Sequence, residues 1–535
     1  MSDDLAVPQL GESAGDPAPA TSGLADGIEV LGGQRRDGGG LSALAGWLLV
    51  AIAAVGLLAS TPPSAGPDEP VQQATAWYLS GHLVQPDTTQ EYSVPASLVV
   101  LPCYINPPRR SAACLAPRSQ NRGMANYSII LNYAPPYFWI VGAGERLAAL
   151  FGLEYADVGG RLASVLLNLG VLFLLGLYMR RRNRLWGNFL LLVSTPMAVF
   201  LDVVVNPSGW EITCGLVMAA ALSEAAWSRL SSVESETWRK STIAFLALAS
   251  IGLCTARPLG FLWASGLTVS AFALAPSIRR QGLLRVVGAV TPGIIVGALW
   301  TRTHPYGVAA PTTFPGLVKA FADTLLYFPE YIRHMFGVLG WLDTPIPGLL
   351  LTLNIAAWAV LLTRLPSFRR AAIVCGVFGI VVVPCAISAS VWAAWPLWWQ
   401  GRYGMPFALG FVLLLLLRSG RLIPRMVSIV SGISLLTLGT MVWVNAIRYG
   451  FGIDGNELPL SLGTPGINPA RLGISAAAGL LLVLVSGYLF VRASRTKPDL
   501  PPGLESEGSR FPRNQLPTEG TSLPTPSPRV AGTDR

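Results

Sequence analysis

Two adjacent carboxylates, Asp68 and Glu69, are the residues whose type and position best suit chemistry in this sequence. They stand just beyond the first long apolar run, 41–60, which is long enough to cross a bilayer. The pair is therefore expected at a membrane surface, where it could act as a general base or bind a metal ion. The flanking prolines of Pro67-Asp68-Glu69-Pro70 are also ordinary turn chemistry, so a purely structural role stays open.

Other polar residues that suit chemistry stand at the ends of later apolar segments. Glu211 begins one of them, and an ionisable group at that depth either binds something or caps the helix N-terminus. Arg402 lies between Trp399 and Tyr403. Its planar guanidinium could hold a phosphate by two parallel hydrogen bonds, or it could simply extend its charge to the membrane surface.

The composition indicates a membrane protein. Of 535 residues, 52% are hydrophobic and only 13% are charged, and the mean hydropathy is +0.50, which is too apolar for a soluble chain of this length. The net charge of +9 does not indicate nucleic-acid binding, because the basic residues stand in short clusters between apolar runs. The sequence has no Gly-Lys-Ser/Thr phosphate loop, which argues against an ATP-driven pump.

The apolar segments predict an all-α polytopic fold with about twelve transmembrane helices, each needing roughly 20 residues. The densest arginine cluster, at 180–184, is expected in the cytoplasm, and basic clusters recur after every second later segment. Both termini are therefore predicted to be cytoplasmic in a multi-pass protein of the cell membrane. The predicted crossings are 41–60, 159–179, 186–204, 209–227, 241–256, 258–276, 284–301, 347–364, 370–391, 405–418, 426–446 and 472–492.

This topology predicts one membrane domain, 41–492, between two disordered cytoplasmic tails, 1–40 and 493–535. A further apolar stretch, 134–152, carries two charges in its middle, so we expect an amphipathic helix on the outer membrane surface there. The stretch 336–343 is apolar enough to re-enter the bilayer. The long extracytoplasmic loops are 61–157, 302–346, 392–404 and 447–471.

Two of the six cysteines, Cys103 and Cys114, lie in the polar loop 61–157. If that loop is extracytoplasmic, they can pair in an oxidising compartment. The other four cysteines fall inside apolar segments and are expected to pack as small apolar residues.

The order of these features resembles the membrane glycosyltransferases with the GT-C fold, which have an acidic pair just after the first span. Four short motifs, over roughly residues 45 to 450, more narrowly resemble the bacterial predicted membrane protein family named domain of unknown function (DUF) 2142. These motifs are Pro67-Asp68-Glu69-Pro70, Asn206-Pro207-Ser208-Gly209, Gly340-Trp341-Leu342-Asp343-Thr344 and Gly401-Arg402-Tyr403.

The resemblance implies a glycosyltransferase that takes a sugar from a polyprenyl-phosphate donor at the extracytoplasmic face, in cell-envelope glycan assembly. Asp68 or Glu69 would be the catalytic base or a metal ligand, and a divalent cation held with Glu211 is a candidate cofactor. Arg402 would neutralise the leaving phosphate, and a glycan or a lipid would be the acceptor. The predicted substrate-binding residues are Arg402, Tyr403, Trp341, Asp343, Asn206, Glu211 and Trp399, with Trp398 beside them as part of a sugar-stacking wall.

Two other classes of function stay open. A secondary transporter would show ionisable residues inside its spans and broken helices in matching halves, whereas here the charges gather outside the spans. A non-catalytic scaffold, or a flippase-like partner in envelope biogenesis, fits the same topology.

Overall fold

Long apolar helices make up most of the chain, because a backbone surrounded by lipid must satisfy its own hydrogen bonds. In the computed structural model, each predicted crossing coincides with a helix or with a pair of consecutive helices. The described residues are 41–82, 91–105, 110–130, 132–180, 182–227, 236–274, 280–304, 313–363, 369–391, 399–419, 424–452 and 466–495. The predicted tails lie outside them, apart from 493–495, and so do 392–398 and 453–465 of the predicted outer loops.

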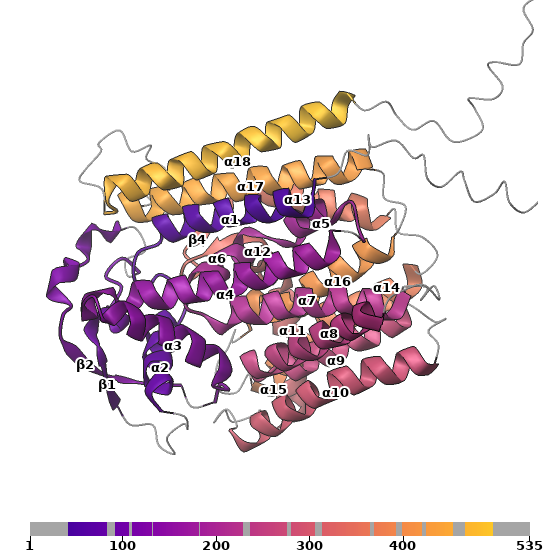
Figure 1. Ribbon diagram of the computed structural model, residues 1–535, viewed down its shortest axis with the longest axis horizontal. Helices are drawn as coiled ribbons and strands as arrows, with labels where there is room; N and C mark the ends of the chain where they lie inside the picture. Colours follow the sequence, from indigo (N-terminus) through magenta and orange to yellow (C-terminus); the bar gives the residue numbers. More distant parts are fainter. Residues whose placement is uncertain are drawn as a thin grey trace, which may run out of the picture.

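Most of the helices that follow the predicted crossings run along a common direction in Figure 1, although α5 and α6 do not share one direction. Among them, α1, α17 and α18 pack side by side along one edge, and α10 lies at the opposite edge. They are α1 (Ala43–Ser60), α4 (Ala156–Met179), α5 (Trp186–Val193), α6 (Pro196–Val203), α7 (Pro207–Trp227), α8 (Glu236–Ala256), α9 (Gly260–Ala273), α10 (Arg280–Thr303), α13 (Gly348–Thr363), α14 (Arg369–Val377), α15 (Val383–Val391), α16 (Met405–Arg418), α17 (Pro424–Phe451) and α18 (Pro469–Arg495).

Within the described residues, seven helices are long and apolar enough to cross a membrane, and the consecutive pair α5 and α6 would make eight. The chain is thus a multi-span membrane protein. Three of the other predicted crossings are shorter apolar helices, at Lys240–Ala256, Gly260–Ala273 and Gly348–Thr363, and α7 is in neither group. The count of about twelve crossings stays a prediction.

One predicted crossing, 186–204, is not a continuous helix. Between α5 and α6 the axis bends by 82°. The reason is local, because the Thr195 hydroxyl accepts a hydrogen bond from the Ala198 amide as an N-cap, and Pro196 at the first helical position has no amide to continue α5.

The segment between α1 and α4 forms a small subdomain at one end of the bundle (Figure 1). It contains the helices α2 (Glu69–Gly81) and α3 (Pro136–Ala149), and the antiparallel strands β1 (Glu91–Pro95) and β2 (Met124–Ser128). A second, shorter ribbon joins β3 (Val338–Leu339), in the stretch 336–343 expected to re-enter the bilayer, to β4 (Thr344–Pro345) just after that stretch. These two ribbons are the strands that the all-α prediction missed among the described residues.

The helix predicted at 134–152 is present as α3, but it is not an isolated surface helix. It packs against both α2 and α4. Gly144 lies so close to the backbone of Gly159 that a side chain at either position would collide. Tyr137 and Phe138 are buried, whereas Trp139, Ile140 and Leu147 are exposed, so one apolar face of α3 remains on the outside.

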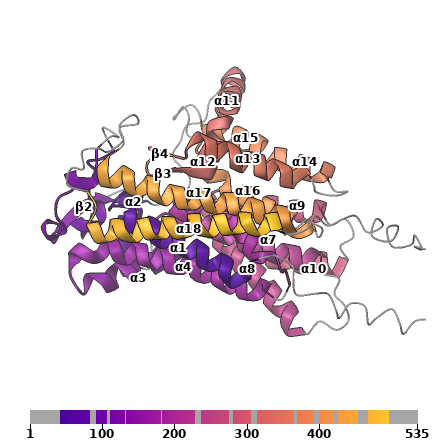
Figure 2. The same cartoon turned by 90° about the horizontal axis from the view of Figure 1, so that it is seen from above.

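Figure 2 shows one helix, α11 (Phe314–Leu326), projecting away from the bundle. It contacts α15 and α12 (Phe328–Gly337). The Thr324 hydroxyl donates to the Ser388 hydroxyl at 2.9 Å in the buried contact with α15. The outward face of α11 carries exposed apolar side chains such as Phe314, Val318 and Leu326.

Glu145 is a buried carboxyl at the junction of α2, α3 and α4. Neither of its oxygens has a hydrogen-bond partner among the described residues. Burial raises the pKa of the Glu145 carboxyl well above its ordinary value; the nearby Asp157 carboxylate acts in the same direction, Arg146 opposes it, and Glu69 adds a smaller rise. The folded chain therefore favours the protonated form of Glu145.

We predict that Glu145→Gln flattens the dependence of stability on pH. In the parent, the folded chain keeps this proton where the unfolded chain has lost it, so the free energy of unfolding falls as pH rises from 4.5 toward the raised pKa. The amide does not titrate. Thermal unfolding in detergent across this pH range should show the parent losing stability relative to Glu145→Gln, and parallel curves for the two proteins would contradict the assignment.

Cys103 and Cys114 form a disulfide, with their Cα atoms 6.1 Å apart. The bridged loop is held to the bundle by Arg448 of α17, whose guanidinium donates to the Tyr104 carbonyl at 2.9 Å and to the Arg110 carbonyl at 2.7 Å. The disulfide therefore closes a loop that docks on the membrane helices.

Replacing both cysteines by serine should lower the free energy of unfolding by about 2–3 kcal/mol, because the unfolded chain gains the entropy that the closed loop removes. Non-reducing mass spectrometry should find the cross-linked peptide in protein from an oxidising compartment. Two free thiols in that material would refute the pairing.

Candidate functional site

Asp68 lies at the N-cap of α2 in a left-handed backbone conformation, with φ of 59°. This conformation is uncommon for a residue other than glycine and is most often found where the surrounding structure imposes it, functional sites included. The Asp68 side chain is 49% exposed, and its Oδ2 accepts a hydrogen bond from Nη2 of Arg402 at 3.0 Å. Two predicted site residues that are 334 positions apart are therefore brought into contact.

Arg402 is buried, yet two of its nitrogens, Nε and Nη1, have no partner among the described residues. It lies in the 3-10 turn η7 (Gly401–Gly404), which packs on α12 so closely that a side chain at Gly401 would collide with the Tyr331 carbonyl. Buried donors without partners cost free energy, because they lose their hydrogen bonds to water and gain none within the protein. These donors suit an anion that enters beside Asp68.

Glu69 has a different role from its neighbour. It is fully buried, and Arg161 of α4 donates to it from Nε at 2.8 Å and from Nη2 at 2.6 Å. The amides of Gly66 and Val205 donate to the same carboxylate at 2.9 and 3.1 Å. The Glu69 oxygens are thus occupied by four structural donors, so we assign it to the scaffold and correct its prediction as an alternative base.

A second arginine that the sequence analysis did not select, Arg257, lies in the short link between α8 and α9. It donates to the Ser208 hydroxyl at 2.6 Å and to the Tyr133 hydroxyl at 3.1 Å. Its guanidinium carbon is 4.4 Å from the centre of the Tyr403 ring, while that of Arg402 is 5.2 Å from the same ring. Two guanidinium groups therefore flank one tyrosine next to Asp68, which gives the site a positive electrostatic potential.

Asn206 and Glu211 lie on the side of the site formed by the start of α7. Asn206 donates to the Pro67 carbonyl at 2.8 Å and accepts from the Ser208 amide at 2.9 Å, so it supports the turn that presents Asp68. Glu211 is buried, and neither of its oxygens has a hydrogen-bond partner among the described residues. Of the two, Asn206 is a positioning residue, and Glu211 is a buried acid behind the site.

Trp341 and Asp343 occupy the turn between β3 and β4, where Gly340 and Leu342 have positive φ values of 66° and 63°. The Trp341 indole donates to the Ser64 carbonyl at 2.9 Å, which ties this turn to the segment before Asp68. Asp343 pairs with Arg448 at 2.7 Å. Both side chains make internal contacts and both are half-buried, and their role in substrate binding stays a prediction.

Trp399 does not form the predicted sugar-stacking wall. It is 1% exposed and packs edge-on against Tyr403 and Trp263, with ring centres 5.7 and 6.3 Å apart. Trp399 thus packs against the Tyr403 ring from the core. The predicted neighbour Trp398 lies outside the described residues.

The predicted carboxylate set for a divalent cation is not assembled. Arg161 engages Glu69, and no group of three or more His, Cys, Asp or Glu side chains in the described part of the chain could hold a metal ion. The donors that remain beside Asp68 are cationic or hydroxylic, which suits an anion better than a cation.

The sequence contains a signal for Arg161 and for Arg257, the two site arginines that the sequence analysis did not select. Arg161 lies inside the predicted crossing 159–179, where an ionisable residue marks a buried partner. Arg257 is the link between the predicted crossings 241–256 and 258–276, on the side where the positive-inside rule disfavours arginine. The sequence does not show which residues Arg161 and Arg257 contact.

Comparison with known proteins agrees with the motif-based resemblance. Residues 51–411 match the family described as predicted membrane protein (DUF2142). The chain belongs to this family. No match was found among curated proteins.

Among solved structures, the DUF2142 chain is similar to the crystal structure of ArnT from Cupriavidus metallidurans bound to undecaprenyl phosphate. The two share 12% sequence identity, the match covers 86% of this chain and 81% of ArnT, and the TM-score is 0.41.

The two adjacent carboxylates should respond differently to loss of charge. Glu69→Gln leaves Arg161 as a buried unpaired cation, so we expect a loss of about 3–5 kcal/mol of stability. Asp68→Asn also removes the carboxylate partner of the buried Arg402, but Asp68 is half exposed, its amide oxygen can still accept from Nη2, and asparagine tolerates the left-handed conformation, so its loss should be smaller than that of Glu69→Gln. Thermal unfolding of the two variants in detergent checks this; equal losses would contradict the division of roles.

Proposed function

We propose that this DUF2142 protein is a membrane glycosyltransferase that takes a sugar from a polyprenyl-phosphate donor at the extracytoplasmic face, in cell-envelope glycan assembly. The observation that carries the proposal is the contact between Asp68, a half-exposed carboxylate, and Arg402, a buried guanidinium with two nitrogens that lack partners in the described chain. Sugar transfer from a lipid phosphate needs a base and an anion site side by side.

In the proposed reaction, the oxygen of an acceptor hydroxyl attacks the anomeric carbon of the donor sugar. The bond from that carbon to the phosphate oxygen breaks, and the polyprenyl phosphate leaves with the bonding electrons. Asp68 accepts the hydroxyl proton through Oδ1, which takes no hydrogen bond from any described residue. General-base assistance of this kind contributes about 10²–10⁴-fold.

Arg402 would bind the phosphate that leaves. Its Nη2 contacts Asp68 while Nε and Nη1 remain to donate, so the same guanidinium can orient the base and hold the anion. Arg257 adds positive charge on the other side of Tyr403. Charge that develops on the leaving phosphate is stabilised by donors that are already in place.

The proposal includes the orientation predicted from the arginine clusters, with both termini in the cytoplasm and Asp68 outside. The membrane supplies the donor laterally, and the acceptor, a glycan or a lipid, arrives from the outer side. A divalent cation is left out of the mechanism, because Glu69 is held by Arg161.

Asp68→Asn should abolish sugar transfer and leave membrane insertion and folding intact, because the amide keeps the shape of the side chain and cannot accept the proton. A transfer assay with a labelled polyprenyl-phosphate sugar and envelope glycan acceptors measures this. Wild-type rates in a folded Asp68→Asn variant would rule out the base and favour a scaffold role for the chain.

Arg402→Lys tests the anion site separately from the base. A lysine keeps the charge but not the planar set of donors, so the affinity for the lipid-linked donor should fall substantially, about tenfold for a difference of 1.4 kcal/mol. Equal affinity of the parent and Arg402→Lys, with a loss only in Arg402→Ala, would indicate simple charge attraction. No binding by the parent to any polyprenyl-phosphate sugar would argue against a glycosyltransferase altogether.

A further inference from the structure

The α1–α2 link, residues 61–67, leads directly to Asp68 and is held by side chains from other segments. Three of its residues are prolines, which have no amide to donate, so the link supplies few hydrogen-bond donors of its own. Its carbonyls accept from donors outside it. The pairs are Thr61 with Arg161 and Arg471, Pro62 with Arg161, Pro63 with Tyr104, Ser64 with Trp341, and Pro67 with Asn206.

Two residues of this stretch have a left-handed backbone, Ser64 with φ of 63° and Asp68 with φ of 59°. For residues other than glycine this conformation costs free energy, and it persists where the surrounding structure imposes it. The external donors supply that constraint, because they hold the carbonyls of Pro63 and Ser64 and the carbonyl just before Asp68. The orientation of the Asp68 carboxylate therefore depends on donors that do not touch it.

Tyr104 differs from the other donors, because it comes from the small subdomain, between β1 and β2, and not from the helix bundle. Its hydroxyl donates to the Pro63 carbonyl at 2.6 Å. Its ring is fully buried in an apolar cluster that includes Ala65 of the same link. The ring and the hydroxyl thus hold the α1–α2 link together.

The backbone of Tyr104 is itself fixed by two contacts. Cys103, the residue before it, forms the disulfide with Cys114, and the Tyr104 carbonyl accepts from Arg448 at 2.9 Å. The second cysteine belongs to the 3-10 turn η3 (Ala112–Cys114), which packs against α17. A chain of contacts therefore runs from α17 and the disulfide, through Tyr104, to the link before Asp68.

We propose that Tyr104 is a positioning residue for Asp68, and that the bridge between Cys103 and Cys114 keeps Tyr104 in place. The inference rests on the proposed function and adds a residue that acts on the base without touching the substrate. A displacement of about 1 Å in a reacting group can lower a rate by about 100-fold, so a small shift of Asp68 is enough to slow transfer. The backbone that carries Arg402 is held by α12, so binding of the lipid phosphate should not depend on Tyr104.

The test compares Tyr104→Phe with Tyr178→Phe. Both substitutions remove one tyrosine hydroxyl from a buried side chain, and the hydroxyl of Tyr178 makes its hydrogen bond with Thr242, at 2.7 Å. Tyr178 lies near the opposite end of α4 from Arg161, about 25 Å along the helix at 1.5 Å per residue. Tyr178→Phe is therefore the matched control for a lost hydroxyl that is remote from Asp68.

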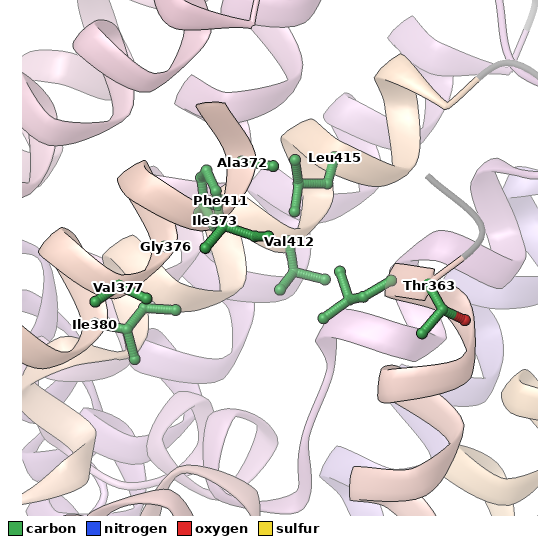
Figure 3. Close-up of a pocket in the computed structure, with 10 residues that line it drawn as sticks. Thr363, Ala372, Ile373, Gly376, Val377, Ile380, Phe411, Val412 and Leu415 are labelled. Carbon is green, nitrogen blue, oxygen red and sulfur yellow. The ribbon is translucent and has the colours of Figure 1, made fainter. Parts of the chain in front are cut away.

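Hydrogen–deuterium exchange of the full chain in detergent measures the anchor without any substrate. Tyr104→Phe should speed exchange in a peptide that spans 61–69, because the link opens more often when one anchor is lost, and Tyr178→Phe should not. Peptides of α14 are an internal reference. This helix lines an apolar cavity of about 310 Å³ near the end of α16 remote from η7, where the side chains of Ile373 and Val377 lie (Figure 3). Exchange there should be equal in all three proteins.

The transfer assay with the labelled polyprenyl-phosphate sugar measures the consequence for the reaction. Tyr104→Phe should lower kcat by about tenfold to 100-fold and leave KM for the donor unchanged, because the anion site is intact. Tyr178→Phe should keep both parameters at the parent values. Replacing Cys103 and Cys114 by serine should act in the same direction as Tyr104→Phe, and combining the three substitutions should add little, because they remove the same anchor.

Parent-like exchange at 61–69 in Tyr104→Phe would overturn the inference, and so would a parent-like kcat. A fall in kcat of equal size in both phenylalanine variants would indicate a general loss of stability, and a matching rise in KM would place the effect at the phosphate site; either contradicts a positioning role. Parent-like behaviour of the serine variant would remove the disulfide from the account. A parent that transfers no sugar would end the proposed function, whereas the exchange experiment decides on the anchor in either case.

Discussion

The buried ion pair between Glu69 and Arg161 is the interaction on which the end of the bundle that carries α2 and α3 depends. Arg161 donates to Glu69 and to the carbonyls of Thr61 and Pro62, at 2.8 and 2.6 Å, so one guanidinium joins the end of α1, the start of α2 and the body of α4. The Val205 amide adds the link between α6 and α7 to the same carboxylate. Because removing either partner would leave an uncompensated buried charge, the four segments are held in one arrangement.

The position of Asp68 follows from this constraint. With Glu69 fixed below it and the Pro67 carbonyl held by Asn206, the residue between them is left in a left-handed conformation with its side chain turned toward Arg402. The strain of that conformation is balanced by the buried contacts on both sides of it. Two consecutive carboxylates thus have opposite properties, since one is saturated with internal donors and the other is half exposed and faces a guanidinium with donors to spare.

The sequence predicted the parts of this arrangement that depend on local pattern. Apolar length located the helices, and the motifs around Asp68, Asn206 and Arg402 marked three segments that do meet in space. The helix at 134–152 and the cysteine pair were also visible, because charge placement and loop polarity are local properties. The sequence did not distinguish Asp68 from Glu69, because their difference lies in Arg161, 92 residues away.

The features that the sequence analysis missed or predicted wrongly are those that apolar length and periodicity do not report. Trp399 reads as a surface aromatic beside a loop, but its burial against Trp263 depends on how α9 meets η7. The break at Thr195 and Pro196 was readable as capping chemistry, yet the apolar residues on both sides concealed it. The β1–β2 ribbon pairs residues far apart in the chain, and the β3–β4 hairpin has only two residue pairs, so periodicity reports neither.

The most direct test of the central claim is to identify the lipids that co-purify with the full chain. Mass spectrometry of lipids extracted from the parent and from Arg402→Ala, both purified in the same mild detergent, reports whether a polyprenyl-phosphate sugar is bound at the Asp68 and Arg402 site. We predict such a lipid with the parent and its loss from a folded Arg402→Ala variant. Absence of any polyprenyl-phosphate lipid from the parent, or equal amounts in both proteins, would contradict the account.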